Sequence, residues 1–408
     1  MKDRFSPVSE RQVVELVNWA LAEQKSLSVQ GRGTKADFGY GDNTDCLVRM
    51  DQMQGILSYD PTELVMQALP GTPMDEIEQA LSEHGQHLAF EPMNLENVYH
   101  SSAGPGTIGG TFMANLSGPR RFKSGAARDH ILGVRAVSGR GQLYKSGGRV
   151  IKNVTGYDMS KLLTGSWGTL SILCEITFKV LPAPRYNRTL CIPDQDAASA
   201  LAFMTTLAQS PYEISGLAYL PPALAARFTP CVELEAGASL TTIRLEGTEL
   251  SVKERTASVM GLIENDTKTL TLDGESSRQL WRGLRDVAAF ADNDATAVVV
   301  KVSVPPATAL DTITILNAAS NVRWYMDAAG GWFWIGMTEG QAGQLISALR
   351  RQCSSTGGSA VLYAAPESVK RSVGVFSRMP EPLAALIRRI KDNFDPQNIL
   401  NPGRLFPD

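Results

Sequence analysis

Residues 104–121 read GPGTIGGTFMANLSGPRR, and residues 125–173 read GAARDHILGVRAVSGRGQLYKSGGRVIKNVTGYDMSKLLTGSWGTLSIL. Residues 104–173 hold 14 of the chain's 36 glycines in 70 of its 408 residues. Glycine lacks a Cβ, so its backbone N–H can approach a ligand closely, and it tolerates a positive φ. Glycine-rich turns between short β-rich runs therefore predict a long, polyanionic cofactor bound largely by the main chain. A dinucleotide is the obvious candidate.

Length and composition limit the classes of protein to consider. A chain of 408 residues exceeds one ordinary hydrophobic core, so two domains are expected and three are allowed. A hydrophobic fraction of 43% and a charged fraction of 20% are typical of a soluble globular protein. The net charge of −3 gives no global indication of nucleic-acid binding, so no nucleic-acid partner is expected.

The N-terminal sequence MKDRFSPVSERQ is charged and lacks the apolar core of a secretory signal. The apolar runs are far shorter than the roughly 20 residues that a membrane span needs. We therefore expect a cytoplasmic protein whose membrane contact is only peripheral, at the inner membrane and through a partner.

Cysteine and histidine usage argues against a metal centre. The five cysteines are scattered without a C-x-x-C pair, which predicts reduced thiols and no iron–sulfur or structural zinc site. The four histidines are His84, His87, His100 and His130, so residues 131–408 contain none. The second half of the chain therefore has no histidine to serve as metal ligand or general base, and no metal is expected.

The pattern of elements changes near Leu181-Pro182-Ala183-Pro184-Arg185, which interrupts any regular element. Before it, a helix capped by Ser9 and short strands predict an α+β domain. After it, helices and strands alternate as in an α+β cap. We expect a domain at 1–182, a cap at 183–378 and a C-terminal segment at 379–408. The helices expected in the cap are Ala197–Ala208, Leu250–Glu264, Ser276–Phe290, Ala307–Ala318 and Thr338–Arg351.

The sequence Gly31-Arg32-Gly33-Thr34-Lys35-Ala36 matches the Rossmann fingerprint G-x-G-x-x-A, and Asp51 lies 20 residues after Gly31. Rossmann geometry needs a helix that opens directly from the loop, but residues 37–43 will not hold one. We interpret the loop as an anion-binding turn whose N–H groups form a nest for a phosphate pair. An ordinary connection between strands is an equally good interpretation of the loop alone.

Basic residues are concentrated in the glycine-rich half: Arg120, Arg121, Lys123, Arg128, Lys152 and Lys161. They form either a solvated face or a group of charges that offsets a diphosphate or a reduced, anionic flavin.

Several motifs together resemble the PCMH-type FAD-binding domain of the vanillyl-alcohol-oxidase superfamily, and within it the FAD-binding E subunits of bacterial glycolate oxidases. The motifs are Gln30–Lys35, Pro70–Pro73, Gly109-Gly110, Arg128–Gly133, Lys152–Asp158 and Gly165–Leu170. Asp60–Val65, Ser117–Arg121 and Asn401–Arg404 are especially similar to the E subunits. The resemblance covers residues 1–185 and about 380–408, whereas the cap matches poorly.

The resemblance implies a two-subdomain FAD-binding fold with a cap and a C-terminal segment that returns to the FAD domain. It places the FAD pyrophosphate on the loop Gln30–Lys35. Thr34-Lys35 stands where covalently flavinylated relatives often carry the attaching histidine, so it implies a non-covalent FAD. The implied FAD-binding residues are Gln30, Gly31, Arg32, Gly33, Thr34, Lys35, Pro70, Gly71, Thr72, Thr107, Gly109, Gly110, Asn115, Gly118, Arg128, Asp129, His130, Ile172 and Asn401.

The resemblance also implies a role inside a glycolate oxidase complex that oxidises glycolate to glyoxylate. The partners would be a larger catalytic flavoprotein subunit and an iron–sulfur subunit, and the flavin would transfer electrons. The related 2-hydroxy-acid dehydrogenases carry an H-x-G-D-G-N-x-H-like motif in the cap, and this chain lacks it. No catalytic base is assigned, although Tyr157 and Lys161 are candidate neighbours of the flavin ring.

Two alternatives remain. The chain could be a self-sufficient FAD-linked oxidoreductase of another small 2-hydroxy acid or alcohol. It could also be a flavin-free assembly scaffold.

Overall fold

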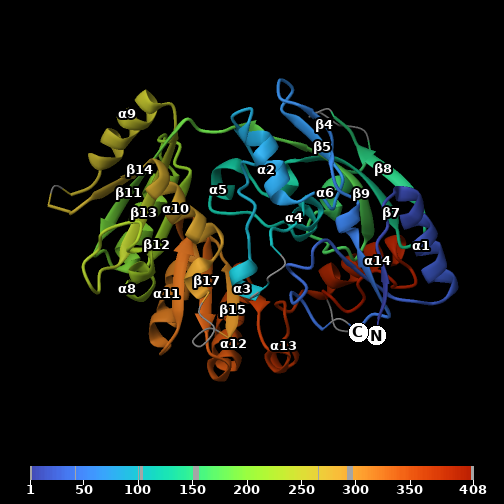
Figure 1. The fold of residues 1–408 in the computed structure, drawn as a ribbon. Helices are drawn as coiled ribbons and strands as arrows, with labels where there is room; N and C mark the ends of the chain where they lie inside the picture. Colours follow the sequence, from blue (N-terminus) through green and yellow to red (C-terminus); the bar gives the residue numbers. More distant parts are fainter. Residues whose placement is uncertain are drawn as a thin grey trace. The chain divides into compact units, whose positions relative to one another are not determined.

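The computed structural model describes residues 2–41, 43–99, 101, 104–149, 156–264, 266–291 and 297–405 (Figure 1). The chain forms two compact units. The first unit consists of Met1–Ser117, Gly125–Ala183 and Arg378–Asp408, and the second of Gly118–Ser124 and Pro184–Ser377. Helices and mostly antiparallel sheets occur in both units, which confirms the α+β class.

The N-terminal part of the first unit is a three-stranded parallel sheet. Its order is β1 (Asp3–Phe5), β3 (Cys46–Arg49) and β2 (Leu27–Gln30). Helix α1 (Glu10–Ala22) begins at Ser9, whose hydroxyl accepts the N–H of Gln12, as its capping pattern predicts. Its apolar side is buried in a core with β2 and β3.

The larger sheet of the first unit has five antiparallel strands. Their order is β4 (Ile56–Asp60), β5 (Val65–Ala68), β9 (Ser171–Lys179), β7 (Ile131–Ser138) and β8 (Leu143–Gly147). Strands β7 and β8 pair as an antiparallel hairpin, with the turn at residues 138–142. The remaining helices and strands are α2 (Met74–Ser82), β6 (Gln86–His87), α3 (Glu96–Tyr99), α4 (Ile108–Ala114), α6 (Met159–Leu163), β10 (Leu181–Pro182) and α14 (Glu381–Phe394).

The second unit contains an eight-stranded antiparallel sheet. Its order is β14 (Leu270–Asp273), β11 (Tyr186–Pro193), β13 (Leu240–Gly247), β12 (Gly216–Leu220), β16 (Arg323–Asp327), β17 (Trp332–Met337), β15 (Val298–Ser303) and β18 (Ser359–Ala364). Its helices are α5 (Arg121–Ser124), α7 (Ala197–Ala208), α8 (Pro222–Ala225), α9 (Glu249–Met260), α10 (Gly274–Arg285), α11 (Ala309–Ala318), α12 (Glu339–Thr356) and α13 (Glu367–Val373).

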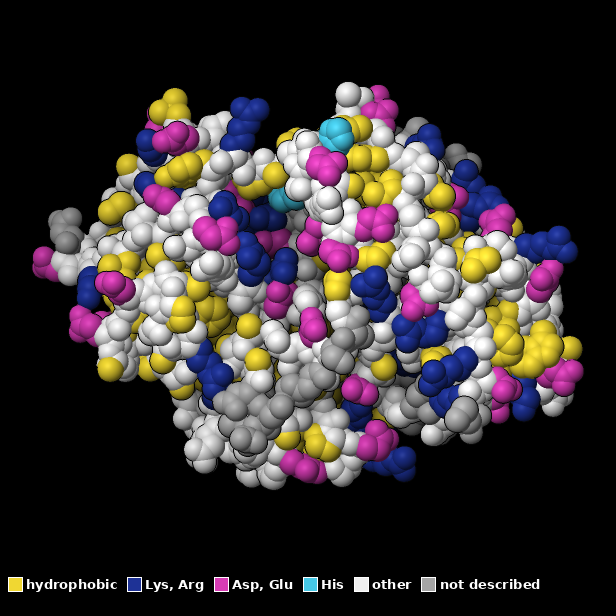
Figure 2. All heavy atoms as spheres, viewed as in Figure 1, with side chains coloured by type: hydrophobic (Ala, Val, Ile, Leu, Met, Phe, Trp, Pro, Cys, Tyr) yellow, Lys and Arg dark blue, Asp and Glu magenta, His cyan; other side chains and the backbone are white. Residues whose placement is uncertain are grey.

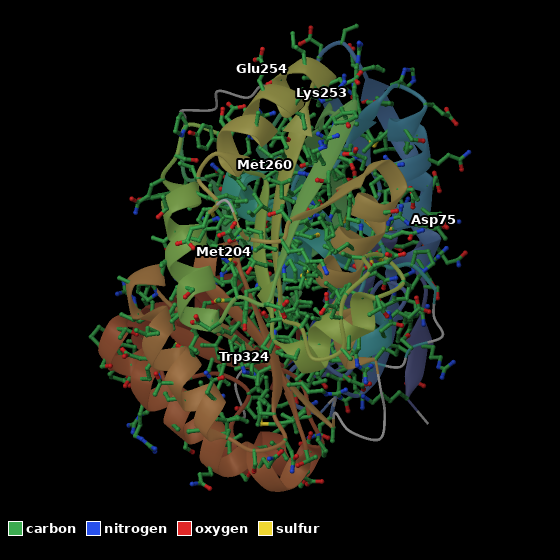
Figure 3. All side chains as sticks on the ribbon, turned by 90° about the vertical axis from the view of Figure 1, so that its left-hand side faces the viewer. Asp75, Met204, Lys253, Glu254, Met260 and Trp324 are labelled. Carbon is green, nitrogen blue, oxygen red and sulfur yellow. The ribbon has the colours of Figure 1, made fainter. Side chains whose placement is uncertain are left out.

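The two faces of this sheet differ in chemistry because directly opposed residues of antiparallel strands point to the same side. One face carries the register Leu190, Ile243 and Leu217, which are all fully buried. Helices α7 and α9 lie on the viewer's side of the sheet in Figure 3, where Met204 of α7 is labelled. The other face carries Thr189 and Arg244, and the indole N–H of Trp281 in α10 donates to Thr189 at 2.8 Å.

Helix α10 is shorter than its sequence pattern predicts. The apolar pattern extends to Phe290, but the helix ends at Arg285 because Val287 adopts a left-handed conformation with φ 55°. A short 3₁₀ turn at Ala288–Phe290 follows. The expected single helix at Ser276–Phe290 is therefore wrong in its second part.

Candidate functional site

The first unit contains a pocket with about 720 Å³ of space outside protein atoms, part of it open to solvent. Most lining residues come from the end of β2 and the loop after it, from α4, from β9 and the segment before it, and from the C-terminal segment. They are Val29–Ala36, Met50, Pro70, Thr107, Gly109, Gly110, Met113, Ala114, Trp167, Gly168, Ser171, Ile172, Leu173 and Arg404.

The loop Gln30–Lys35 forms one wall of the pocket. No helix follows it in the described residues 31–41, which contain turns and bends, so the Rossmann interpretation is excluded. Asp51, the acid at Rossmann spacing, instead pairs with Arg49 at 2.6 Å. A Cβ at Gly31 would overlap Thr107 Oγ1, so this position requires glycine.

Positive charge borders this wall. Lys35 Nζ donates to Thr34 Oγ1 at 3.2 Å, and desolvation, aided by nearby Arg404, lowers the pKa of Lys35 to about 8. Arg404 donates to the carbonyl oxygen of Lys35 at 2.7 Å, and Arg32 also lines the pocket. Three cations beside a glycine-rich loop create a site that favours an anion.

An aromatic residue forms part of the opposite lining. The ring of Trp167 stacks on Phe38 with centroids 3.8 Å apart, and the Arg404 guanidinium lies 5.5 Å from the Trp167 ring centroid. Trp167, Gly168 and Arg404 were not among the predicted site residues. They belong to the motifs Gly165–Leu170 and Asn401–Arg404, on which the family resemblance rests. The resemblance did not imply a role for these three residues.

Eleven of the 19 predicted site residues line the pocket: Gln30, Gly31, Arg32, Gly33, Thr34, Lys35, Pro70, Thr107, Gly109, Gly110 and Ile172. The other eight do not line it: Gly71, Thr72, Asn115, Gly118, Arg128, Asp129, His130 and Asn401.

Gly71 and Thr72 hold the segment that follows β5. Gly71 N–H donates to Met53 O at 2.8 Å, and a Cβ at Gly71 would overlap Met50 O. Thr72 Oγ1 donates to Leu69 O at 2.7 Å and accepts the N–H of Gly55 at 2.9 Å. Both residues therefore fix the backbone that presents Pro70 to the pocket.

A second group of these residues surrounds the end of α4. Asn115 caps the helix with a positive φ of 50°, and its Oδ1 accepts the N–H of Arg128 at 3.1 Å. Asp129 Oδ2 accepts the N–H of Ala126 at 2.8 Å. His130 is fully buried, and its ring lies 5.2 Å from that of Phe90. Gly118 groups with the second unit.

Asn401 contributes to the site from behind the pocket wall. Its Oδ1 accepts the N–H of Val29 at 2.7 Å, and its Nδ2 donates to Trp167 O at 2.8 Å. Both Val29 and Trp167 line the pocket. One buried amide thus joins two segments of the lining.

Of the basic residues expected to offset a diphosphate, the five that the structure describes do not line this pocket. Arg120 forms a bidentate ion pair with Glu246, and Arg120, Arg121 and Lys123 belong to the second unit. Lys161 pairs with Asp158 at 3.1 Å, and Tyr157 is 92% exposed. Within the pocket the cations come from other residues, namely Lys35, Arg32 and Arg404.

Lys152, with most of the Lys152–Asp158 motif, lies outside the described residues. Among the residues that the structure describes, no group of three or more His, Cys, Asp or Glu side chains is placed to hold a metal ion. No helix in the described ranges is long and apolar enough to cross a membrane.

Comparison with known proteins gives matches along the whole chain. The family described as "FAD binding domain" matches residues 4–147, and "FAD linked oxidases, C-terminal domain" matches residues 376–405. The chain is 32% identical to glycolate oxidase subunit GlcE of Escherichia coli (strain K12), over 97% of each chain. It is 25% identical to D-lactate dehydrogenase of Archaeoglobus fulgidus, over 98% of this chain and 90% of the relative.

Solved structures share the fold. p-Cresol methylhydroxylase superposes with a TM-score of 0.73 at 16% identity, covering 99% of this chain and 88% of that chain. 4-Ethylphenol oxidase from Gulosibacter chungangensis gives a TM-score of 0.72 at 14% identity, covering 99% and 89%. The expected two-subdomain FAD-binding fold with a cap is therefore confirmed.

Proposed function

The chain belongs to the FAD-linked oxidase family that includes glycolate oxidase subunit GlcE, and from that membership we propose that it is the FAD-binding subunit of a glycolate oxidase complex. The observation that carries the proposal is the 32% identity to a subunit of that enzyme over 97% of both chains. Family membership makes the chain an FAD-dependent oxidoreductase, so FAD is its cofactor.

The residues of the pocket in the first unit fit FAD. The loop Gln30–Lys35 and the glycines at 109 and 110 offer walls without bulky side chains, which suits a ligand bound by backbone N–H groups. Lys35, Arg32 and Arg404 supply the charge that a diphosphate needs, and Trp167 and Ile172 supply apolar surface for a ring. We propose that this pocket holds the FAD.

Bound FAD would supply the redox chemistry, and the chain's own residues would bind and orient it. Lys35 and Arg404 would hold negative charge at the loop. Asn401 would keep Val29 and Trp167 at a fixed separation. Gly71 and Thr72 would act one layer further out, by fixing the backbone that presents Pro70 to the ligand. Asn115 would end α4, the helix that contributes Gly109 and Gly110 to the pocket.

We propose that the first unit is the FAD domain, with its C-terminal segment, and that the second unit is the cap. The proposed partners are a catalytic flavoprotein subunit and an iron–sulfur subunit, in a cytoplasmic complex that contacts the membrane only peripherally. The reaction is the oxidation of glycolate to glyoxylate, with electrons leaving through the partners. On the face shown in Figure 2, acidic and basic side chains are interspersed, as expected for a protein without a nucleic-acid partner.

The deciding experiment purifies the chain alone and together with the products of neighbouring genes. We expect a yellow protein that co-purifies with two further subunits, and glycolate oxidation by the complex. The chain alone should turn over neither glycolate nor D-lactate with an artificial electron acceptor. A protein that stays colourless after FAD addition would favour the scaffold alternative.

A second candidate is a self-sufficient oxidoreductase of another small 2-hydroxy acid. The 25% identity to D-lactate dehydrogenase over 98% of this chain favours it. Robust turnover of D-lactate or glycolate by the isolated chain would support this candidate and refute the subunit role.

A further inference from the structure

The polar face of the sheet in the second unit carries a cluster of cations and aromatic rings that the proposed FAD pocket does not use. Lys301 of β15 is opposite Trp334 of β17 in the strand register, so both side chains point to this face. Lys301 Nζ lies 3.8 Å from the ring centroid of Trp332 and 5.1 Å from that of Trp334. Arg121, at the start of α5, lies 5.0 Å from the same Trp332 ring. Two cations therefore meet at one indole.

The ammonium group of Lys301 has no oxygen partner in the described part of the chain. It makes cation–π contacts with the two indole rings, and neither a hydrogen bond nor an ion pair to it is present among those residues. Asp327 lies on the same face of β16, its Oδ1 accepts the N–H of Ala328, and its charge acts on Lys301 less strongly than that of Arg121. Within the described ranges, this half-buried cation therefore has no anionic partner to offset its partial loss of water.

Electrostatics agree with this geometry. Desolvation, and secondarily the charge of Arg121, lower the pKa of Lys301 to about 7, and the charge of Asp327 opposes the shift only partly. An anion placed between the two cations would stabilise both charges. Lys301, Arg121 and Trp332 are all partly exposed, so a small solute can reach the cluster.

Resting on the proposed function, we propose that Lys301 and Arg121 bind the carboxylate of a small 2-hydroxy acid against the ring of Trp332. Two cations on one ring exclude a cationic ligand, and a carboxylate matches the fork of a guanidinium with an ammonium beside it. Trp334, whose ring also contacts Lys301, lies 4.9 Å from the ring of Tyr363 in an edge contact, so apolar rings flank the two cations. The site lies wholly within the second unit.

Calorimetric titration of the full-length chain with glycolate and with its neutral analogue ethylene glycol tests the proposal. We expect glycolate to bind and ethylene glycol not to bind. Lys301→Met should weaken glycolate binding about ten- to a hundredfold, the usual effect of losing a hydrogen bond to a charged group. Lys301→Arg, which keeps the charge, should retain most of the affinity.

The matched control is Lys253→Met, because Lys253 is an exposed lysine of the same unit that pairs with Glu249 on α9 (Figure 3). It should bind glycolate as the wild type does. The proposal is overturned if Lys301→Met, shown by circular dichroism to be folded, binds glycolate with unchanged affinity. Equal binding of glycolate and ethylene glycol would overturn it too.

Titration with D-lactate separates this inference from the proposed function. If the wild type binds D-lactate but not glycolate, and Lys301→Met abolishes that binding, the carboxylate site stands while the proposed substrate fails. If the FAD-loaded wild type binds neither acid, the carboxylate site is refuted whatever the activity of the complex.

Discussion

The side-chain amide of Asn401 donates to the carbonyl oxygen of Trp167 at 2.8 Å, and its oxygen accepts the N–H of Val29 at 2.7 Å. Asn401 is 3% exposed, so its bonds replace water at two backbone groups. The residue itself is held by a backbone bond to Leu27 O at 2.9 Å. The C-terminal segment thereby fixes two parts of the pocket lining at once.

Asn401→Ala should lower the free energy of unfolding by about 2–4 kcal/mol, because it leaves two buried backbone groups without their partner. It should also weaken FAD binding through the displaced Trp167. Urea unfolding and FAD titration measure the two effects. Asn393→Ala is the control, since the Asn393 amide only bonds Arg389 O on the exposed side of α14. If Asn401→Ala keeps the wild-type unfolding free energy and FAD affinity, the two hydrogen bonds from Asn401 to Val29 and Trp167 are dispensable.

FAD affinity should depend on pH through Lys35. The folded pKa of about 8 lies below the usual lysine value of 10.5, and a bound diphosphate favours the protonated form. Affinity should therefore fall about tenfold between about pH 7 and about pH 9 and stay flat in Lys35→Met. In the protein without FAD, the folded state below pH 8 must keep the Lys35 ammonium charged in a desolvated position. Between pH 8 and 10.5 the folded lysine has lost its proton, whereas the unfolded lysine still carries it. The free energy of unfolding should therefore rise over this range.

FAD titrations at several pH values, with the exposed Lys145→Met as the control, check the role of Lys35. The control should keep the wild-type pH dependence. An equally steep loss of affinity in Lys35→Met would assign the titration to another group.

Gly109→Ala should abolish FAD loading. A Cβ at Gly109 would lie 2.7 Å from both Cβ and O of Pro70, and both residues line the pocket, so the added methyl group forces the two walls apart. The flavin content per chain of the purified protein measures the effect. Gly340→Ala in α12 meets nothing within 4 Å and should load FAD normally. Normal loading of Gly109→Ala would refute the assignment of this pocket to FAD.

Glu246→Gln should destabilise the second unit by about 3–5 kcal/mol, because it removes the negative charge that faces Arg120 at 2.8 Å and Arg244 at 3.6 Å. Burial opposes ionisation of Glu246, but Arg244 and Arg120 outweigh it and hold its pKa well below the usual value. This stabilisation is present above the unfolded pKa of about 4.3 and is lost as the pH falls below it.

Denaturant unfolding at neutral and acid pH checks this pair. The difference between wild type and Glu246→Gln should shrink in acid. Glu249→Gln, which alters an exposed pair with Lys253, should have little effect at either pH. A difference that is independent of pH would point to lost packing rather than lost charge.

The FAD should leave the protein on acid precipitation. The pyrophosphate loop carries Thr34 and Lys35 where the resemblance puts an attaching histidine in covalent relatives. Yellow colour in the acid supernatant is the expected result, and colour retained in the pellet would reveal a covalent bond.

Local signals predicted much of the secondary structure. Helix α7 has the predicted bounds Ala197–Ala208, because Asp196 caps it and its apolar residues recur at helical spacing. Helix α4 was not predicted, because Gly109 and Gly110 in its first turn have low helix propensity. Tertiary contact stabilises it, since Gly109 N–H donates to Pro70 O at 2.9 Å.

The residues of the site also separate into those that local sequence patterns predicted and those that depend on tertiary contacts. Glycine spacing left the loop Gln30–Lys35 with two equally good interpretations, an anion-binding turn and an ordinary connection, and the family resemblance assigned it to the pyrophosphate. Trp167 and Arg404 join the pocket only through packing between segments far apart in the chain, which no local pattern encodes. No local pattern marks Lys301 either, because the groups near it, Arg121 of α5 and Trp332 of β17, come from other parts of the chain.

The short segment Gly118–Ser124 groups with the second unit although both of its flanks belong to the first, so the chain passes between the units at four points. Neither unit is encoded by one uninterrupted stretch of gene. Exchange of a cap between related enzymes by recombination would therefore have to carry this heptapeptide along with residues 184–377. Otherwise Arg120 of one parent would face a foreign residue in place of Glu246. Hybrid enzymes that exchange residues 184–377 without the heptapeptide should therefore be recovered only as insoluble protein.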